Sequence, residues 1–407
     1  MRTARPSLPV YDKAFPMSEL NDLLTRGVAE VIVAAELRQR LDAGTPLRLK
    51  QGFDPTKPDM HIGHAVGLRK LRKFQELGHQ VVLIVGDWTA QIGDPSGRDE
   101  TRTRLTAAEV QANAATYMEQ FFRVIDRERT EIRWQSEWFG TFTFEHALDL
   151  AGRFTLAQML AHETFRKRYD EGTPLTILEL MYPMLQAYDS VVIKADVEFG
   201  GTDQKFNILA GRELMAQHGM TPQQVFLLPL IPGTDGRKMS KTFLNTVDIG
   251  MPPAEMFGRV MSMSDEVLPL YFEVLSDMPT AEVAALRPAL AAGSVSPRDL
   301  KLRLAREIVS QFHSPAAGQA AEDAFIRQFV NRELPTDIPE HALTAPVNII
   351  ELLVSTGLAA SKGEARRLID GGGVKVDSQR VASYEQTLQP GAGVVVQVGR
   401  RKFVRVV

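Results

Sequence analysis

Residues 47–85 read LRLKQGFDPTKPDMHIGHAVGLRKLRKFQELGHQVVLIV, and this stretch decides the architecture of the N-terminal half of the chain. Leu47 to Phe53 has the pattern of a short strand, Gly63 to Leu77 that of an amphipathic helix, and Val81 to Val85 that of a buried strand. A strand–helix–strand unit of this kind joins two parallel strands, which need such a crossover. Because ligands of open α/β sheets bind at the carboxyl ends of the strands, we expect a site where the first loop emerges.

The composition predicts an ordinary globular protein. At 407 residues the chain is long enough for two or three domains of roughly 150 residues each. It has no cysteine, which excludes disulfides, thiolate metal sites and thiol nucleophiles. The N-terminus lacks the apolar core of a signal peptide, and no run approaches the roughly 20 apolar residues of a membrane span. We therefore expect a cytoplasmic protein with no membrane partner.

Positive charge is concentrated near the C-terminus. The formal net charge of the whole chain is -3, which would argue against a polyanionic partner if the charge were evenly spread. Residues 344–407, however, contain nine Lys or Arg against five Asp or Glu. This segment is therefore where we expect a nucleic acid to bind.

The α/β pattern is interrupted and then resumes. Residues 105–185 are mostly helical in pattern, as expected of an insertion. Val191 to Phe199 has the pattern of a strand, which leads into Gly200 to Gln204 and a helix from Lys205 to His218.

Helices and a linker follow residue 241. Ser296 is a candidate N-cap for a helix that continues to Phe312. Glu333 to Pro346 contains three prolines and several charges, and we place a domain boundary there. The tail beyond it predicts helices near residues 348–355 and 362–369 and strands at 374–376 and 394–398.

Two histidines stand three residues apart at the start of the first predicted helix, in Pro58 to His64 (PDMHIGH). His61 and His64 share one face of the helix end, where backbone N–H groups are unpaired and the helix dipole is positive, which suits an anion. Gly63 lets a phosphate approach the backbone, and Asp54 to Thr56 shapes the entering loop. An isolated pair of this kind is more often a capping or surface pair, and a zinc pair would need a third ligand that we do not find.

Two lysines, Lys238 and Lys241, lie in the polar loop Gly233 to Thr242 (GTDGRKMSKT). A loop that carries two point charges can close over a triphosphate and follow the charge as it leaves, which is electrostatic stabilisation of the transition state. Alone, such a loop is usually a solvated basic turn. Combined with the histidine loop, it favours chemistry on ATP.

These two loops resemble the HIGH and KMSKS signatures of class I aminoacyl-tRNA synthetases, the first letter for letter and the second in all but its last residue. Other stretches resemble those of bacterial tyrosyl-tRNA synthetases, and the resemblance runs from about Pro46 to the C-terminus. They are Gly52 to Thr56 (GFDPT), Gly93 to Gly97 (GDPSG), Tyr182 with Leu185 to Asp189 (LQAYD), and Gly200 to Gln204 (GGTDQ).

The resemblance implies a role for each matched residue. The implied catalytic residues are His61, His64, Lys238 and Lys241, and the implied ATP-binding residues are these four with Asp54, Thr56, Gly63, Gly201 and Asp203. The implied tyrosine-binding residues are Asp94, Tyr182, Gln186, Asp189 and Gln204. Asp189 would distinguish tyrosine from phenylalanine, because a buried carboxylate gains a hydrogen bond from the phenol hydroxyl and none from phenylalanine. Singly, Asp189 could be a capping aspartate, and Tyr182 and Gln186 could be ordinary helix residues.

Two further features accompany the resemblance. Many bacterial tyrosyl enzymes have Tyr-Cys where this chain has Lys50 and Gln51, which resembles the other bacterial branch and leaves a second phenol contact missing. The tail, Ile349 to Val406, resembles the S4-like RNA-binding module. Lys362, Arg366 and Arg367 fall on neighbouring positions of its predicted helix and would meet successive phosphates, with a solvated basic face as the alternative.

The resemblance therefore implies an α/β fold of three domains: a Rossmann-like parallel-sheet catalytic domain (1–245) with a helical insertion (about 105–185), an α-helical tRNA-contacting domain (246–335), and an α+β S4-like domain (345–407). It implies a tyrosine–tRNA ligase whose partners are tyrosine, ATP and tRNA(Tyr), with Mg²⁺ carried on the ATP phosphates and no protein-bound metal. We also expect a homodimer.

Three alternatives are weaker. A tryptophan synthetase shares both signatures but has no use for a phenol-reading Asp189 and usually lacks the tail. An inactive relative that only binds RNA would have lost histidines or lysines of the signatures, which are intact here. Another nucleotidyltransferase with a similar histidine loop is disfavoured by the lysine loop and by the basic tail.

Overall fold

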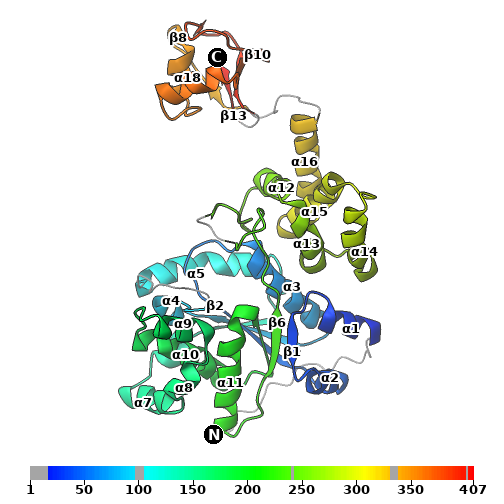
Figure 1. Cartoon of the computed structure of the whole chain (residues 1–407), viewed down its shortest axis with the longest axis vertical. Coiled ribbons are helices and arrows are strands. Elements are labelled where there is room, and N and C mark those ends of the chain that lie inside the picture. Colours follow the sequence, from blue (N-terminus) through cyan, green and yellow to red (C-terminus); the bar gives the residue numbers. More distant parts are fainter. Residues whose placement is uncertain (1–16, 97–104, 240–242, 331–337, 400–401) are drawn as a thin grey trace. The chain divides into compact units, whose positions relative to one another are not determined.

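A computed structural model describes residues 17–96, 105–239, 243–330, 338–399 and 402–407 (Figure 1). The chain divides into two compact units, Met1–Glu322 and Asp323–Val407. A six-stranded sheet organises the first unit and a five-stranded sheet the second. None of the helices in the described ranges combines the length and the apolar character that a membrane crossing needs.

The sheet of the first unit has the order β1-β6-β5-β2-β3-β4, and all its neighbours are parallel except β1 and β6. From β2 the chain adds strands outward to β3 and β4, and it then returns to build β5 and β6 on the other side. The order therefore reverses between β2 and β5, which is where open α/β sheets bind ligands. The strands are β1 (Glu30–Ile32), β2 (Arg48–Phe53), β3 (Gln80–Val85), β4 (Thr130–Trp134), β5 (Val197–Gly201) and β6 (Gln224–Leu228).

Helices cover both faces of this sheet (Figure 1). On one face, Phe74 of α3 (Ile62–Glu76) contacts Phe199 and Phe226 with ring centroids 5.4 and 5.8 Å away, and Phe121 of α5 (Ala107–Phe121) lies 4.9 Å from Phe53. On the other face, α10 (Ile177–Ile193) and α11 (Lys205–Gln217) share a buried apolar cluster with β3. Burial of both faces explains the nearly continuous apolar run of β3.

The remaining elements of the first unit are mostly helical. Ser296 caps α15 as predicted, because its side chain accepts a hydrogen bond from the backbone N–H of Asp299. The helices are α1 (Met17–Thr25), α2 (Ala34–Asp42), α4 (Thr89–Ile92), α6 (Ser136–Phe139), α7 (Phe144–Gly152), α8 (Leu156–Met159), α9 (Glu163–Asp170), α12 (Pro253–Met261), α13 (Leu268–Leu275), α14 (Thr280–Ala291), α15 (Pro297–Phe312) and α16 (Pro315–Phe325).

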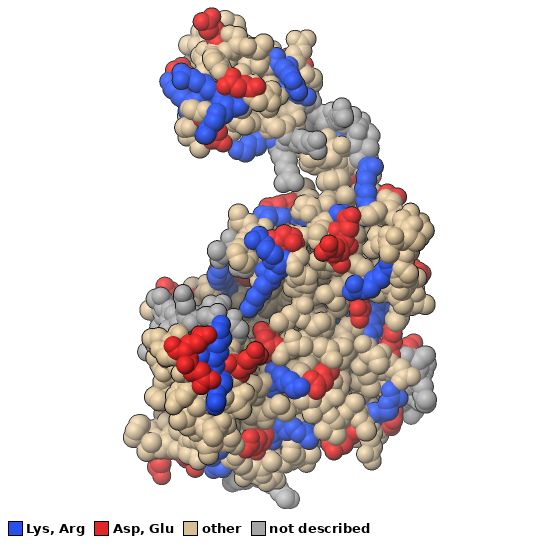
Figure 2. Space-filling view, in the orientation of Figure 1, with Lys and Arg blue, Asp and Glu red and all other residues tan. Residues whose placement is uncertain are grey.

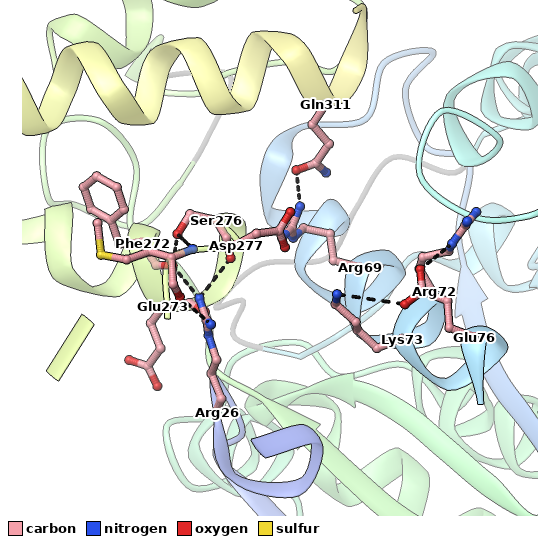
Figure 3. Close-up of polar contacts among 11 residues, drawn as sticks. Arg26, Arg69, Arg72, Lys73, Glu76, Phe272, Glu273, Ser276, Asp277 and Gln311 are labelled. Atoms are coloured by element: carbon pink, nitrogen blue, oxygen red, sulfur yellow. Dashed lines mark hydrogen bonds and ion pairs between the residues drawn. The ribbon is translucent and has the colours of Figure 1, made fainter. Parts of the chain in front are cut away.

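Arg26 and Lys70 together link α3 to the helices after residue 250, and Figure 3 shows the contacts of Arg26. Arg26 donates hydrogen bonds of 2.6–3.2 Å to four backbone carbonyls in residues 272–278, at the C-terminal end of α13. Lys70 of α3 donates to the carbonyls of Leu23 and Arg26 at 2.9 and 2.7 Å. The helix that begins at the two histidines is therefore tied at Lys70 to the end of α1, and through Arg26 to the end of α13.

The predicted strand–helix–strand unit is confirmed as β2, α3 and β3, but the sequence prediction was wrong at two places. The stretch 105–185, expected to be helical, contains β4, whose five residues are all only half-buried and so lack an apolar run. Residues 191–193, expected to be strand, finish α10, which ends at Lys194 in a left-handed conformation with φ 53°. The apolar side chains there pack in a helix.

The second unit combines a sheet of order β10-β9-β12-β13-β7 with a β8–β11 pair and two helices. The predicted helices and strands of the tail are confirmed here, whereas residues 331–337 of the predicted linker lie outside the described residues. The elements are β7 (Glu340–His341), β8 (Val347–Asn348), α17 (Ile349–Ser355), α18 (Lys362–Asp370), β9 (Val374–Val376), β10 (Gln379–Arg380), β11 (Thr387–Leu388), β12 (Val395–Val398) and β13 (Lys402–Val406). Because β7 belongs to this sheet, the predicted linker contributes to the folded unit.

Candidate active site

A cavity of about 490 Å³ opens at the carboxyl ends of β2, β5 and β6, where the strand order reverses. It brings together every residue of the described ranges that the sequence predicted for ATP or tyrosine. These residues are Asp54, Thr56, His61, Gly63, His64, Asp94, Tyr182, Gln186, Asp189, Gly201, Asp203, Gln204 and Lys238. Lys241 lies outside the described residues, as do Ser240 and Thr242 beside it and Gly97 of the GDPSG stretch.

The histidine loop enters α3 through His61, which is the N-cap residue. The backbone N–H of His61 donates to Nδ1 of His64 at 3.2 Å, and the two ring centroids are 4.1 Å apart. Nδ1 of His64 also lies 3.2 Å from the carbonyl oxygen of His61, so the ring is held against the backbone of that residue. A Cβ on Gly63 would lie 2.8 Å from Nδ1 of His61, so a larger residue would displace that ring.

The helix end offers an anion fewer backbone donors than the sequence predicted. The N–H of Ile62 donates to the carbonyl of Val247 at 2.9 Å, and that of His64 donates to the carbonyl of His61 at 2.9 Å. With the N–H of His61, which donates to Nδ1 of His64, three of the four terminal N–H groups are therefore already used within the protein. This makes the imidazole rings the more prominent polar groups of this wall.

Asp54 links the histidine side of the cavity to α10. Its carboxylate accepts hydrogen bonds from the hydroxyl of Tyr182 at 2.8 Å and from that of Thr89 at 2.7 Å. Burial, followed by the charge of Asp54, raises the pKa of Tyr182 well above its usual value, so this phenol stays protonated. Since its hydrogen points at Asp54, the oxygen of Tyr182 remains an acceptor for a cationic group.

Asp94 is a second carboxylate in the lining of the cavity. It accepts from Nε2 of Gln204 at 2.7 Å and from the backbone N–H of Ser96 at 2.8 Å. Near it, burial and the charge of Asp94 raise the pKa of Asp203, while the charge of Lys238 lowers it. Lys238 of the lysine loop thus acts electrostatically on Asp203, and both residues line the cavity.

Asp189 is buried at the bottom of the cavity, with 2% of its surface exposed. It accepts from Nε2 of Gln135 at 2.9 Å and from Nε1 of Trp138 at 3.2 Å. Oε1 of Gln135 accepts from the backbone N–H of Thr89 at 3.0 Å, which fixes the orientation of the amide. Burial raises the pKa of Asp189 to about 7, although Lys50 and these two donors oppose the rise.

The sequence did not predict Gln135 and Trp138 as site residues. They follow β4, the strand that was missed, and they reach Asp189 across 54 and 51 residues of chain. The only signal was their position at the carboxyl end of a strand next to β3.

In the second unit, the predicted RNA-binding residues lie on α18, whose Ala365 and Ile369 face the core. Lys362, Arg366 and Arg367 are exposed, and Lys362 forms an ion pair of 3.1 Å with Glu351. Figure 2 shows basic side chains gathered on this unit, with a few acidic ones among them.

Comparisons with known proteins agree with this geometry. Residues 42–330 match the family model of class I tRNA synthetases for tryptophan and tyrosine, and residues 331–406 match that of the C-terminal domain of tyrosine–tRNA ligases. A tyrosine–tRNA ligase of Dehalococcoides mccartyi is 49% identical over 96% of this chain and 99% of its own length, and one of Thermotoga maritima is 46% identical over 94% and 96%. The chain belongs to the tyrosine–tRNA ligase family.

Solved structures show the same fold at low identity. A truncated mitochondrial tyrosyl-tRNA synthetase of Aspergillus nidulans has a TM-score of 0.63 at 20% identity and covers 76% of this chain and 94% of its own. The enzyme of Archaeoglobus fulgidus has a TM-score of 0.61 at 21% identity and covers 76% and 100%. The chain thus has the class I fold. Its family activates tyrosine with ATP and charges tRNA. The match to the C-terminal domain of tyrosine–tRNA ligases and the names of the relatives exclude the alternative of a tryptophan synthetase.

Asp189→Asn should lower the preference for tyrosine over phenylalanine by about 10- to 100-fold, because a hydrogen bond to a charged acceptor is replaced by a neutral one. The measurement is the ratio of kcat/KM values for the two amino acids in ATP–pyrophosphate exchange. Asp149→Asn, on the surface in an ion pair with Arg153, is the matched control. A wild-type ratio in Asp189→Asn would remove Asp189 from the phenol site.

Proposed function

We propose that the cavity holds tyrosine and ATP in line, so that the tyrosine carboxylate attacks the α-phosphate and pyrophosphate leaves. The convergence of all the described predicted residues on one cavity carries this proposal. No covalent enzyme intermediate is required. With both reactants bound, the protein has to orient them and to stabilise charge on the leaving pyrophosphate.

On the ATP side we assign charge stabilisation to His61, His64, Lys238 and Lys241. Nδ1 of His64 lies 3.2 Å from both the backbone nitrogen and the carbonyl oxygen of His61, which holds the ring in the cavity wall. Thr56, Gly63 and Gly201 line the same cavity, and Asp203 can accept from ribose hydroxyls. Mg²⁺ enters as part of the ATP substrate, on its phosphates.

On the tyrosine side we assign the α-ammonium group to Asp94, Tyr182 and Gln186. Asp94 supplies a carboxylate, and Tyr182 presents an oxygen whose own hydrogen is directed at Asp54. Gln204, bonded to Asp94, holds that carboxylate in place. Asp189 accepts the phenol hydroxyl at the far end of the pocket.

Lys238→Ala should slow adenylate formation by about 10²-fold, the usual cost of one preorganised electrostatic donor, while tyrosine binding changes little. Stopped-flow or burst measurements of adenylate formation test this, and Lys241→Ala should behave in the same way. The control is Arg237→Ala, one residue away, whose guanidinium pairs with Asp235 and covers the Phe243 ring. Adenylate formation at wild-type speed in Lys238→Ala would contradict the assigned role.

For the second step we propose that the second unit helps to bind tRNA(Tyr) and that the ribose hydroxyl at its 3′ end then takes the tyrosyl group. The exposed cations of α18 support this role for residues 345–407. We retain 1–245 as the catalytic domain, with its insertion at about 105–185, and 246–335 as a helical domain that contacts tRNA. A cytoplasmic location fits a reaction that needs tRNA.

Arg366→Ala combined with Arg367→Ala should weaken tRNA binding and reduce the slope of log K against log salt by about two, one for each lost phosphate contact. Filter binding at several salt concentrations measures the slope. Replacing both residues by lysine keeps the charge and should restore most of the slope. Exchange without tRNA should stay normal in both variants, and an unchanged slope in the alanine variant would exclude α18 from the RNA site.

We further propose a homodimer that forms through the segment α7 to α10. Large apolar side chains on this segment are exposed: Phe144, Leu148, Leu156, Tyr169 and Ile177 have 57–79% of their surface accessible. Exposed apolar groups concentrated in one segment mark association surfaces.

Phe144→Asp combined with Ile177→Asp should convert the dimer into a monomer, because each places a charge in an apolar interface. Sedimentation velocity measures the mass. Leu244→Asp, at an equally exposed leucine outside the segment, should leave the dimer intact. A monomeric wild type, or a double variant that remains dimeric, would refute this interface.

A further inference from the structure

Lys50, the residue at which the sequence departs from many tyrosyl enzymes, is completely buried. Its Nζ lies 2.9 Å from Oε1 of Glu198, and the side chains of the two residues are 0% and 1% exposed. The ammonium also donates to Oγ of Ser190 at 2.7 Å and to the carbonyl of Gln186 at 2.8 Å. Its three hydrogens therefore have three acceptors, from β5 and α10.

The partner carboxylate is satisfied as well. Glu198 accepts from Nε2 of Gln186 at 3.1 Å, from Oγ of Ser190 at 3.1 Å, and from Nε2 of Gln223. Gln186 is thus held both by its backbone carbonyl and by its side chain, and it lines the tyrosine pocket one turn before Asp189. The buried ion pair and the pocket share one hydrogen-bonded network.

We propose that Lys50 is a positioning residue for tyrosine recognition: its ammonium, anchored by Glu198, fixes Gln186 and places a buried positive charge against Ser190, the residue next to Asp189. The inference rests on the proposed role of Asp189 as the acceptor of the phenol hydroxyl. In this chain, a cation behind the pocket thereby takes the place of a second phenol contact.

The charges around Asp189 decide whether a substitution raises or lowers the pKa of its carboxyl group. Lys50 lowers the pKa of Asp189, and Glu198 raises it by a smaller amount. From α10, Tyr182 faces the same carboxylate as a neutral phenol, with Asp54 and Asp94 beyond it. From the β4 side the contacts are the neutral Gln135 and Trp138, the latter with Arg133 located 5.7 Å from its ring.

If the Lys50–Glu198 pair only stabilised the fold, its replacement would have a different effect. Replacing a buried pair by neutral residues of similar volume often leaves stability unchanged, and it would then leave the pH profile unchanged too. If the pair acts on Asp189, removing its charges must shift the acid limb of the pH profile. Loss of Lys50 and loss of Glu198 must shift this limb in opposite directions.

The test is the pH dependence of kcat/KM for tyrosine in ATP–pyrophosphate exchange. Lys50→Met combined with Glu198→Gln, which leaves no isolated charge, should move the acid limb to higher pH by less than about one unit, because the loss of Glu198 offsets only part of the loss of Lys50. Glu198→Gln alone should move the limb to lower pH. The control, Arg48→Met with Glu131→Gln, neutralises a more exposed pair on the same sheet and should not move it.

Acid limbs at the wild-type position in both variants, or displaced in the same direction, would overturn the inference. If either variant melts below the assay temperature, the profiles are compared at a lower temperature at which both variants are folded, and the same shifts decide. Asp189→Asn separates this inference from the proposed site, because it should abolish the limb. A limb that persists in Asp189→Asn refutes the role of Asp189 itself.

Discussion

A buried carboxylate needs compensation from its surroundings, and in this chain the surroundings of Asp189 come from several distant segments. Trp138 and Gln135 donate to it from the end of β4, and Lys50 acts on it from β2. These groups meet only because β2, β3 and β4 lie side by side with α10 across one face. If Asp189 accepts the phenol hydroxyl as proposed, the recognition of tyrosine depends on the order of the strands as much as on the signature loops.

The proposed ATP end and the proposed phenol end of the cavity differ in how their side chains would act on the substrates. At the ATP end, the proposed groups are partly exposed histidines and a lysine that stabilise charge as it develops, which is a property of the transition state. At the proposed phenol end, buried groups fix the single acceptor Asp189 in advance, and such an acceptor would give selectivity in binding. Near the middle of α3, Lys70 donates to the carbonyls of Leu23 and Arg26, which ties the helix that carries the histidines to the segment around α1.

The sequence predicted the parts of the site that recur as local motifs. His61 and His64 at a helix start, Lys238 in a glycine-bounded loop, and Asp189 on α10 all line the cavity as expected. It missed β4, because a half-buried edge strand has no apolar run, and with it Gln135. It also left Lys50 unexplained, because a lysine in a strand reads as a surface residue until its partner Glu198, far along the chain, is placed beside it.

The protonation of Asp189 tests the account most directly. With aspartate side chains labelled with ¹³C and the signal assigned through Asp189→Asn, NMR can follow its carboxyl titration with and without tyrosine. The account predicts a midpoint at about 7 in the free enzyme and a lower one with tyrosine bound, since a phenol that donates to the carboxylate favours its ionised form. A midpoint that is unchanged or higher with tyrosine bound would contradict it.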